Sequence, residues 1–151
     1  MEMQMNYEQR DPMGMYKGTM NFGSGPDARH GPGPILMGAD TLVGNDVYNK
    51  DSDDLGNIKE IMLNVRTGRI SYAVLSFGGF LGMGEKLFAV PWEALELDTE
   101  NKRFVLDVDR TRLQGAPGFD KSRWPDMADA AWEKGIHAYY GTKPYSEQSR
   151  V

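Results

Sequence analysis

The sequence of 151 residues contains no cysteine, which excludes disulfide bonds, thiolate nucleophiles and cysteine-ligated zinc. Histidine is also scarce: His30 and His137 are the only two, and they are too far apart in sequence to form a local metal motif. No Gly-x-Ser-x-Gly elbow is present. The acidic turn DSDDLGN has Leu55 and Met62 where a calcium-binding EF-hand needs oxygen ligands. We therefore expect no enzyme activity, no metal and no cofactor.

A basic charge excess and long apolar runs are lacking too. The formal net charge is −5, whereas nucleic-acid binders usually carry basic charge that neutralises phosphates. No apolar run approaches the length of a membrane span. The first residues, MEMQMNYEQRDP, contain acids and no apolar core of a secretory signal. We therefore expect a cytoplasmic protein without a transmembrane segment, and we do not expect nucleic acid as its partner.

Composition divides the chain into three regions. Residues 1–38 are rich in Met, Gly and Pro and show no periodicity, which predicts an arm that is either disordered or ordered by a partner. Residues 39–113 alternate short apolar segments with turn residues, as all-β proteins do. Residues 114–151 are dense in aromatic side chains. This extension either covers the barrel or contacts a partner, because large aromatics dominate burial.

The central region predicts five or six short strands. The strand candidates are Leu42–Tyr48, Ile58–Val65, Ile70–Phe77, Leu87–Val90 and the alternating segment Phe104–Val108. Asp51–Asn57 is a predicted polar turn, and Arg66–Arg69 is a predicted tight hairpin in which Gly68 adopts positive φ. Short strands joined by hairpins indicate a mostly β protein with a small antiparallel barrel, because closure removes exposed edges.

One helix is predicted in the C-terminal extension. Asp126 is suited to cap its first turn, and Gly135 is suited to end it. Between them, Ala128 and Trp132 are four residues apart and would share one helix surface.

The segment Ser76–Leu95, SFGGFLGMGEKLFAVPWEAL, contains a glycine-rich loop that resembles a phosphate-binding loop at first sight. Gly79 and Gly84 have the required separation, but Glu85 follows in place of lysine, and Lys86 is not followed by Ser or Thr. A carboxylate at this position repels phosphate. The loop is therefore interpreted as a connection between two strands.

Much of the central region resembles the PRC-barrel domain. The resemblance lies in three motifs: V-Y-N-x-x-x-x-x-L-G-x-I-x-x-I (Val47–Ile61), T-G-R-I-x-Y-A-V (Thr67–Val74), and F-G-G-F-L-G-M-G-E-K running into V-P-W-E-A-L. The tail Ala116–Tyr145 is similar to that of stand-alone bacterial members, although Ser146 replaces an aromatic residue that many of them have.

This resemblance implies a small β-barrel that serves binding and assembly and has no catalytic residues. In the family, the domain occurs in the cytoplasmic part of the purple-bacterial reaction-centre H subunit. It also occurs in a maturation factor of the small ribosomal subunit. A photosynthetic role does not follow from the resemblance, because the H subunit carries a membrane helix and this sequence shows none.

A partner surface is predicted around the glycine-rich loop and the aromatic tail. Apolar side chains at a hairpin tip would be exposed to water, and exposed apolar clusters tend to mark contact sites. The alternative is that the loop folds back and plugs one end of the barrel. The predicted surface residues are Phe80, Leu81, Met83, Lys86, Trp124 and Trp132.

The sequence therefore favours a non-enzymatic protein-binding or assembly module that self-associates into a homo-oligomer. Two alternatives stay open. One is an RNA- or ribosome-associated assembly factor, by analogy with the maturation factor. The other is a small-molecule or enzymatic role for a pocket at one end of the barrel.

Overall fold

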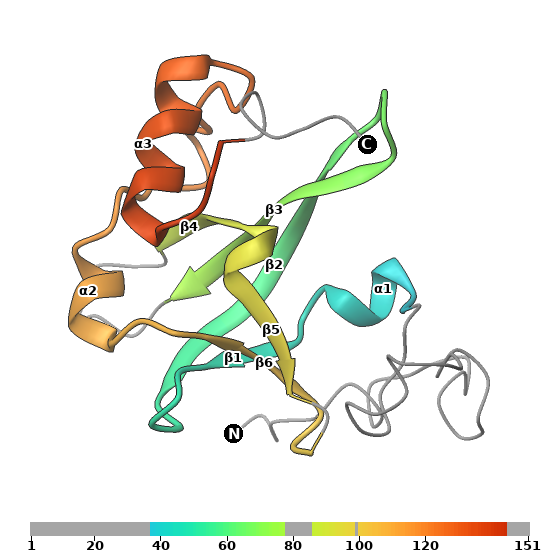
Figure 1. The fold of residues 1–151 in the computed structure, drawn as a ribbon, viewed down its shortest axis with the longest axis vertical. Coiled ribbons are helices and arrows are strands. Elements are labelled where there is room, and N and C mark those ends of the chain that lie inside the picture. Colours follow the sequence, from blue (N-terminus) through green and yellow to red (C-terminus); the bar gives the residue numbers. More distant parts are fainter. Residues whose placement is uncertain (1–36, 78–85, 99, 145–151) are drawn as a thin grey trace.

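The structure is a computed structural model, and it describes residues 37–77, 86–98 and 100–144 (Figure 1). Nearly all of the predicted arm, residues 1–36, lies outside the described residues. The elements in chain order are α1 (Ala39–Leu42), β1 (Asp46–Tyr48), β2 (Asp54–Asn64), β3 (Arg69–Phe77), β4 (Lys86–Pro91), the 3₁₀ helix η2 (Trp92–Ala94), β5 (Leu95–Asp98), β6 (Arg103–Leu106), α2 (Arg110–Gln114) and α3 (Ala130–Tyr140).

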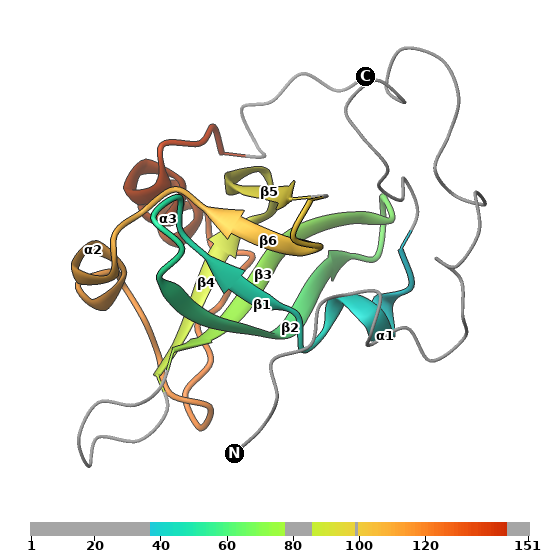
Figure 2. The same ribbon diagram turned by 90° about the horizontal axis from the view of Figure 1, so that it is seen from below.

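The six strands form one curled sheet in the order β4-β3-β2-β1-β6-β5, seen as a half-barrel in Figures 1 and 2. The predicted mostly β class is confirmed. Four neighbouring pairs are antiparallel, as predicted, but β1 and β6 are parallel. No hairpin joins these two strands, so turn chemistry gave no signal for their pairing. The two ends of the sheet, β4 and β5, are consecutive in the chain and are linked by η2.

The main core lies on the inner, concave face of this sheet. Side chains alternate between the two faces of a regular strand, so every second residue of β3 and β4 points inward. On β3 the inward residues are Ala73, Leu75 and Phe77, and on β4 they are Phe88 and Val90. Further buried members are Leu42, Val47, Leu55, Ile58, Phe104, Leu106, Leu113 and Ala116.

The outer face of β3 and β4 is covered by the C-terminal extension. A second, smaller cluster forms there from Tyr72, Ala89 and Ile136, with Trp132 and Phe119 packed against it. Figure 1 shows α3 standing beside β3 and β4. The cluster explains why the chain continues beyond the barrel, since β3 and β4 are apolar on both faces and need cover on both.

The helix α3 differs from its predicted limits. It starts at Ala130, capped by the Asp129 carboxylate, which accepts a hydrogen bond from the Trp132 N–H at 3.0 Å. It ends at Tyr140 and is followed by the capping residue Gly141, which has a φ of 73°. The limits predicted at Asp126 and Gly135 are therefore wrong. Burial of Ile136 in the second cluster extends the helix past Gly135, because this contact outweighs the weak helix propensity of one exposed glycine.

The predicted strand Leu42–Tyr48 is also wrong in its first half. Leu42 ends α1, and the Asn45 amide side chain donates to the carbonyl oxygen of Thr41 at 2.5 Å, which closes the turn after the helix. Gly44 then redirects the chain with a φ of 95°. Local side-chain hydrogen bonds of this kind compete with strand formation.

The strand β2 begins earlier than predicted, inside the polar turn expected over Asp51–Asn57. Asp54 already pairs with Tyr48 of β1, and the side chain of Leu55 is fully buried. By contrast, the hairpin at Arg66–Arg69 is confirmed, with Gly68 at a φ of 77°. The helix α2 was not predicted, because five residues show no measurable period.

The β2–β3 hairpin extends beyond the rest of the sheet. β1 reaches β2 only at residues 54–57, and β4 reaches β3 only at residues 72–77. In the described part of the chain, residues 59–71 therefore make strand pairs only within the β2–β3 hairpin, and we call them the hairpin extension. Figure 1 shows it as the long ribbon rising away from the curled sheet.

Candidate binding surface

Half of the predicted partner surface lies in the glycine-rich loop. Phe80, Leu81 and Met83 fall outside the described residues. The two ends of the loop are described, and they form a strand pair between Phe77 of β3 and Lys86 of β4. The loop therefore leaves the sheet at the end where β4 begins.

Lys86 lies beneath the end of helix α2. Its Nζ atom donates to the backbone carbonyl oxygen of Gln114 at 3.4 Å and lies 5.0 Å from the centroid of the Phe88 ring. A Cβ atom added at Gly118 would lie 2.9 Å from the backbone carbonyl oxygen of Leu87, so glycine permits this close approach of the chain to β4. The Arg110 guanidinium stands over the ring of Phe77, 5.4 Å from its centroid. Two cations thus flank the base of the loop.

The segment after α2 covers the outer edge of β4. Phe119 forms an isolated antiparallel bridge with Leu87, with backbone hydrogen bonds of 2.8 and 2.9 Å in the two directions. This bridge protects an edge that would otherwise be open to another strand. Trp124 packs against the Phe119 ring at a centroid distance of 5.0 Å, and 43% of Trp124 is exposed. Trp124 is therefore a large apolar side chain presented to solvent next to β4.

Trp132 has a different environment. It projects from α3 onto Tyr72, with ring centroids 5.2 Å apart in an edge-on arrangement, and it is only partly exposed. The structure thus brings Lys86 and Trp124 to the start of β4, while Trp132 belongs mainly to the contact between α3 and β3. Of the described residues in the predicted surface, Trp124 offers the most apolar area to a partner.

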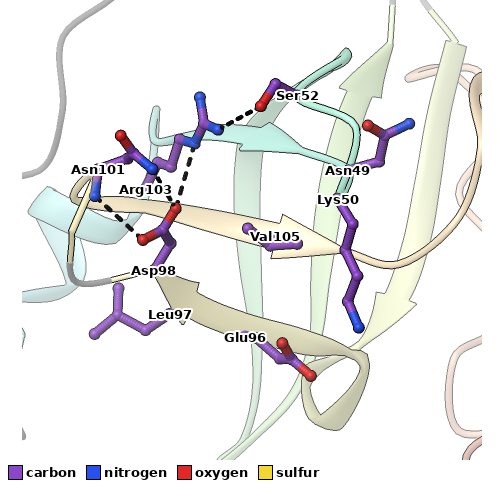
Figure 3. A pocket seen from close by; sticks show the side chains of 9 residues that line it. All are labelled: Asn49, Lys50, Ser52, Glu96, Leu97, Asp98, Asn101, Arg103 and Val105. Atoms are coloured by element: carbon purple, nitrogen blue, oxygen red, sulfur yellow. Dashed lines mark hydrogen bonds and ion pairs between the residues drawn. The ribbon is translucent and has the colours of Figure 1, made fainter. Parts of the chain in front are cut away.

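A polar pocket of about 370 Å³ lies elsewhere on the molecule, on the outer face of β6 (Figure 3). Arg103 donates from its guanidinium to Ser52 Oγ at 3.2 Å, and its Nε lies 3.7 Å from the Asp98 carboxylate. The guanidinium carbon also lies 4.0 Å from the Tyr48 ring centroid. Lys50 and Glu96 stand at the other end of the pocket (Figure 3).

Asp98 holds the turn beside this pocket. Burial by itself raises the pKa of the Asp98 carboxyl, but hydrogen bonds from the Asn101 side chain and from the backbone of Asn101 and Glu100 outweigh it. The Arg103 charge adds to them, and the net effect lowers the pKa. Asp98 is therefore ionised and already engaged by its own turn, which is a structural role and not that of a proton donor.

A family comparison identifies the fold. The family model of the PRC-barrel domain matches residues 34–113, which is more than half of the chain. The chain belongs to the PRC-barrel family. A comparison with curated proteins gives no match. The PRC-barrel domain indicates a general protein-interaction and assembly module.

The described part of this PRC-barrel protein offers few groups for other chemistry. Within the described residues, no three His, Asp or Glu side chains are grouped so that they could hold a metal ion. Among the described helices, none has the length and apolar character needed to cross a membrane.

Buried titratable side chains are found between α3 and the barrel. His137 is fully buried, its Nδ1 lies 2.7 Å from Thr142 Oγ1, and its ring centroid is 5.7 Å from that of Tyr72. Burial lowers the pKa of His137, and the charges of Glu133 and Glu93 oppose this effect only in part. Burial also raises the pKa of Tyr72. Both side chains are therefore neutral near pH 7 and act as packing groups.

Sequence reasoning missed the pocket and the edge-covering bridge. The pocket combines the β1–β2 turn with β5 and β6, which are far apart in sequence, so no local pattern signals it. The bridge at Phe119 comes after helix α2, which has five residues and is capped by Asp109. The Asp residue before Arg-Thr-Arg could have indicated this helix, because Asp is a preferred N-cap residue.

Proposed function

We propose that this PRC-barrel protein is a non-enzymatic binding and assembly module of the cytoplasm that associates with copies of itself. The observation that carries the proposal is the exposure of Trp124, whose ring packs against that of Phe119 at the edge of β4. Large aromatic side chains held rigidly on a surface are frequent anchors of protein contacts, because they bury much area and lose little conformational entropy.

The surroundings of Trp124 favour a protein partner. Phe119 links Trp124 to Leu87 in β4. The residue before Leu87 is Lys86, which begins β4 at the base of the glycine-rich loop. The predicted partner residues Phe80, Leu81 and Met83 belong to this loop, so the proposed surface extends from Trp124 to the loop. An apolar centre beside a cation is a common composition of protein interfaces.

The N-terminal arm is the second part of the proposal. Its Met-rich composition suits a contact with irregular apolar surface, since methionine is unbranched and flexible. We propose that the arm contacts a neighbouring copy and strengthens the assembly.

Light scattering of the full chain over about 1 to 100 µM tests the proposal. We expect a mass above that of the monomer, and we expect Trp124→Ser to lower it while Trp124→Phe, which keeps an aromatic ring, retains it. A second chain that begins at Pro34 tests the arm, because this start preserves Met37, which packs against the core. A monomeric full chain at every concentration would refute self-association.

A further inference from the structure

The hairpin extension ends in an apolar and basic tip, formed by residues 63–69. Leu63 is 51% exposed and Val65 is 89% exposed. Arg66 and Arg69 are exposed as well, and residues 61–70 contain no acidic side chain. The tip is thus positively charged on a chain whose formal net charge is −5.

The tip is held in one shape by local hydrogen bonds. The Asn64 side-chain oxygen accepts from the backbone N–H groups of Arg66 and Thr67, at 2.9 and 3.3 Å. Thr67 Oγ1 accepts from the N–H of Arg69 at 3.3 Å. A preorganised turn of this kind lowers the entropy cost of docking, so its exposed side chains are ready for a contact.

Acidic side chains gather at the opposite end of the molecule, around the polar pocket. Among the described residues, this acidic end has seven carboxylates against three cations. The carboxylates are Asp51, Asp53, Asp54, Glu96, Asp98, Glu100 and Asp107, and the cations are Lys50, Lys102 and Arg103. The pocket also has apolar walls at Leu97 and Val105. The pocket lining itself is balanced, with Glu96 and Asp98 against Lys50 and Arg103, so the excess negative charge comes from the surrounding turns.

The two ends cannot meet within one molecule. The strand β2 runs from Asp54 at the acidic end to Asn64 at the tip. With 11 residues and a rise of about 3.3 Å between neighbours, the strand is about 33 Å long when measured along its path. Figure 1 shows the hairpin tip and the β1–β2 and β5–β6 turns on opposite sides of the molecule. A contact between them requires a second chain.

We propose that copies of this protein join head to tail, with the hairpin tip of one chain in the acidic end of the next. Val65 and Leu63 would enter the pocket, and Arg66 and Arg69 would face carboxylates such as Asp51 and Glu96. This inference rests on the proposed self-association and assigns surfaces to it. The contact is heterologous, so repetition produces a ring or an open chain of subunits.

The charge pattern favours this partner and this orientation. A chain with an overall negative charge repels its own copies, and a positive tip provides a direction of approach that is attractive. Arginine pairs with carboxylates through charge-assisted hydrogen bonds, and the exposed apolar tip adds burial that is independent of salt. The assembly should therefore weaken with salt without vanishing.

Charge reversal tests the contact in the full chain. The tip variant is Arg66→Glu with Arg69→Glu, and the end variant is Asp51→Lys with Glu96→Lys. All four side chains are exposed, so the fold of both variants should persist. Light scattering at about 0.05 M salt should show that the mass of each variant alone is shifted towards that of the monomer. An equimolar mixture of the two variants should regain the wild-type mass, because the acidic tip of one variant then attracts the basic end of the other. Lys134→Glu with Lys143→Glu changes the net charge as much as the tip variant does and should leave the mass unchanged.

The outcomes separate this inference from the proposed function. A wild-type oligomer that neither variant weakens would overturn the head-to-tail contact and leave self-association standing. Variants that dissociate without recovery on mixing would also overturn it. A monomeric wild type would overturn both.

If the tip variant instead loses binding to a labelled single-stranded oligonucleotide while its mass is unchanged, the tip is a nucleic-acid contact and the proposal is wrong. Val65→Ser, which leaves charge unchanged, should weaken assembly in the same direction.

Discussion

The two halves of strand β2 contain similar residues in opposite environments. In the first half, Leu55 and Ile58 are almost completely buried between β1 and β3. In the second half, Leu63 and, just beyond the strand, Val65 are exposed. The apolar character of these residues is alike, so the difference in burial comes from the neighbouring strands. Only the first half has a partner strand on both sides.

The outer face of the hairpin shows the same division. At its base, Tyr72 and Met62 lie under α3 and contact Ile136 and Trp132. The described residues of the tip belong to neither apolar cluster. One end of the hairpin thus builds the fold, and the other end is free for the contact proposed above.

The largest effect in this comparison should come from two glycines of the hairpin. A Cβ at Gly56, with a φ of +100°, would lie 2.0 Å from the carbonyl oxygen of Ser76, whereas a Cβ at Gly68, with a φ of +77°, meets nothing within 4 Å. We expect Gly56→Ala to destabilise the protein by about 3 kcal/mol or more, since strain and a backbone clash add together. Gly68→Ala should cost about 1 kcal/mol, because only the positive φ is unfavourable.

Urea denaturation of both glycine variants measures this difference. Equal costs at the two positions would show that the barrel relaxes around Gly56 and would remove the distinction between base and tip.

The second comparison uses two leucines of the same strand. Leu55→Ala removes a fully buried side chain and should cost about 2–5 kcal/mol through lost transfer energy and a cavity. Leu63→Ala should change the free energy of unfolding by about 0.5 kcal/mol or less, as exposed positions usually do. The shift of the midpoint in chemical denaturation gives both numbers. A large cost for Leu63→Ala in the monomer would mean that the tip is packed within its own chain.

The smallest effect is the pH dependence of the α3 cover. His137 has a lowered pKa in the fold because it is buried. Its protonation is therefore easier in the unfolded chain, where the pKa is about 6.5. Stability should be fully present above this value and should decrease as the pH falls through it towards the folded pKa.

Denaturation midpoints between about pH 7.5 and 5.5 measure this change above the pH range in which most carboxylates titrate. His137→Gln, which cannot titrate, should show a flatter profile over the same range, even if its stability is lower at every pH. Profiles of equal slope would mean that other groups control the acid sensitivity.

Local signals in the sequence were enough for several elements. Gly68 in the run Arg-Thr-Gly-Arg predicts the hairpin, and the structure confirms it. The mostly β class and the PRC-barrel family also followed from motifs and their spacing. The limits of α3 did not follow, because Gly135 looked like a stop, while the burial of Ile136 extends the helix to Tyr140. Tertiary contact outweighed local propensity there.

The candidate surfaces divide in the same manner. Trp124 could be chosen from sequence as a large apolar residue in the tail, but its exposure depends on how residues 118–124 cross the edge of β4. Trp132 was chosen by the same reasoning, and the structure packs it on Tyr72. Composition ranks such residues equally, because it contains no information on which of them meets a neighbour.

The sequence by itself determined the Arg66–Arg69 hairpin, the strand-rich character, the family and the absence of cysteine chemistry, since these depend on residues close together in the chain. Only the tertiary structure decided that β1 lies parallel to β6, that an acidic end forms around a pocket, and that half of a single strand projects beyond the sheet. Pairing between distant segments depends on the summed burial of many side chains, and no short stretch of sequence specifies that sum.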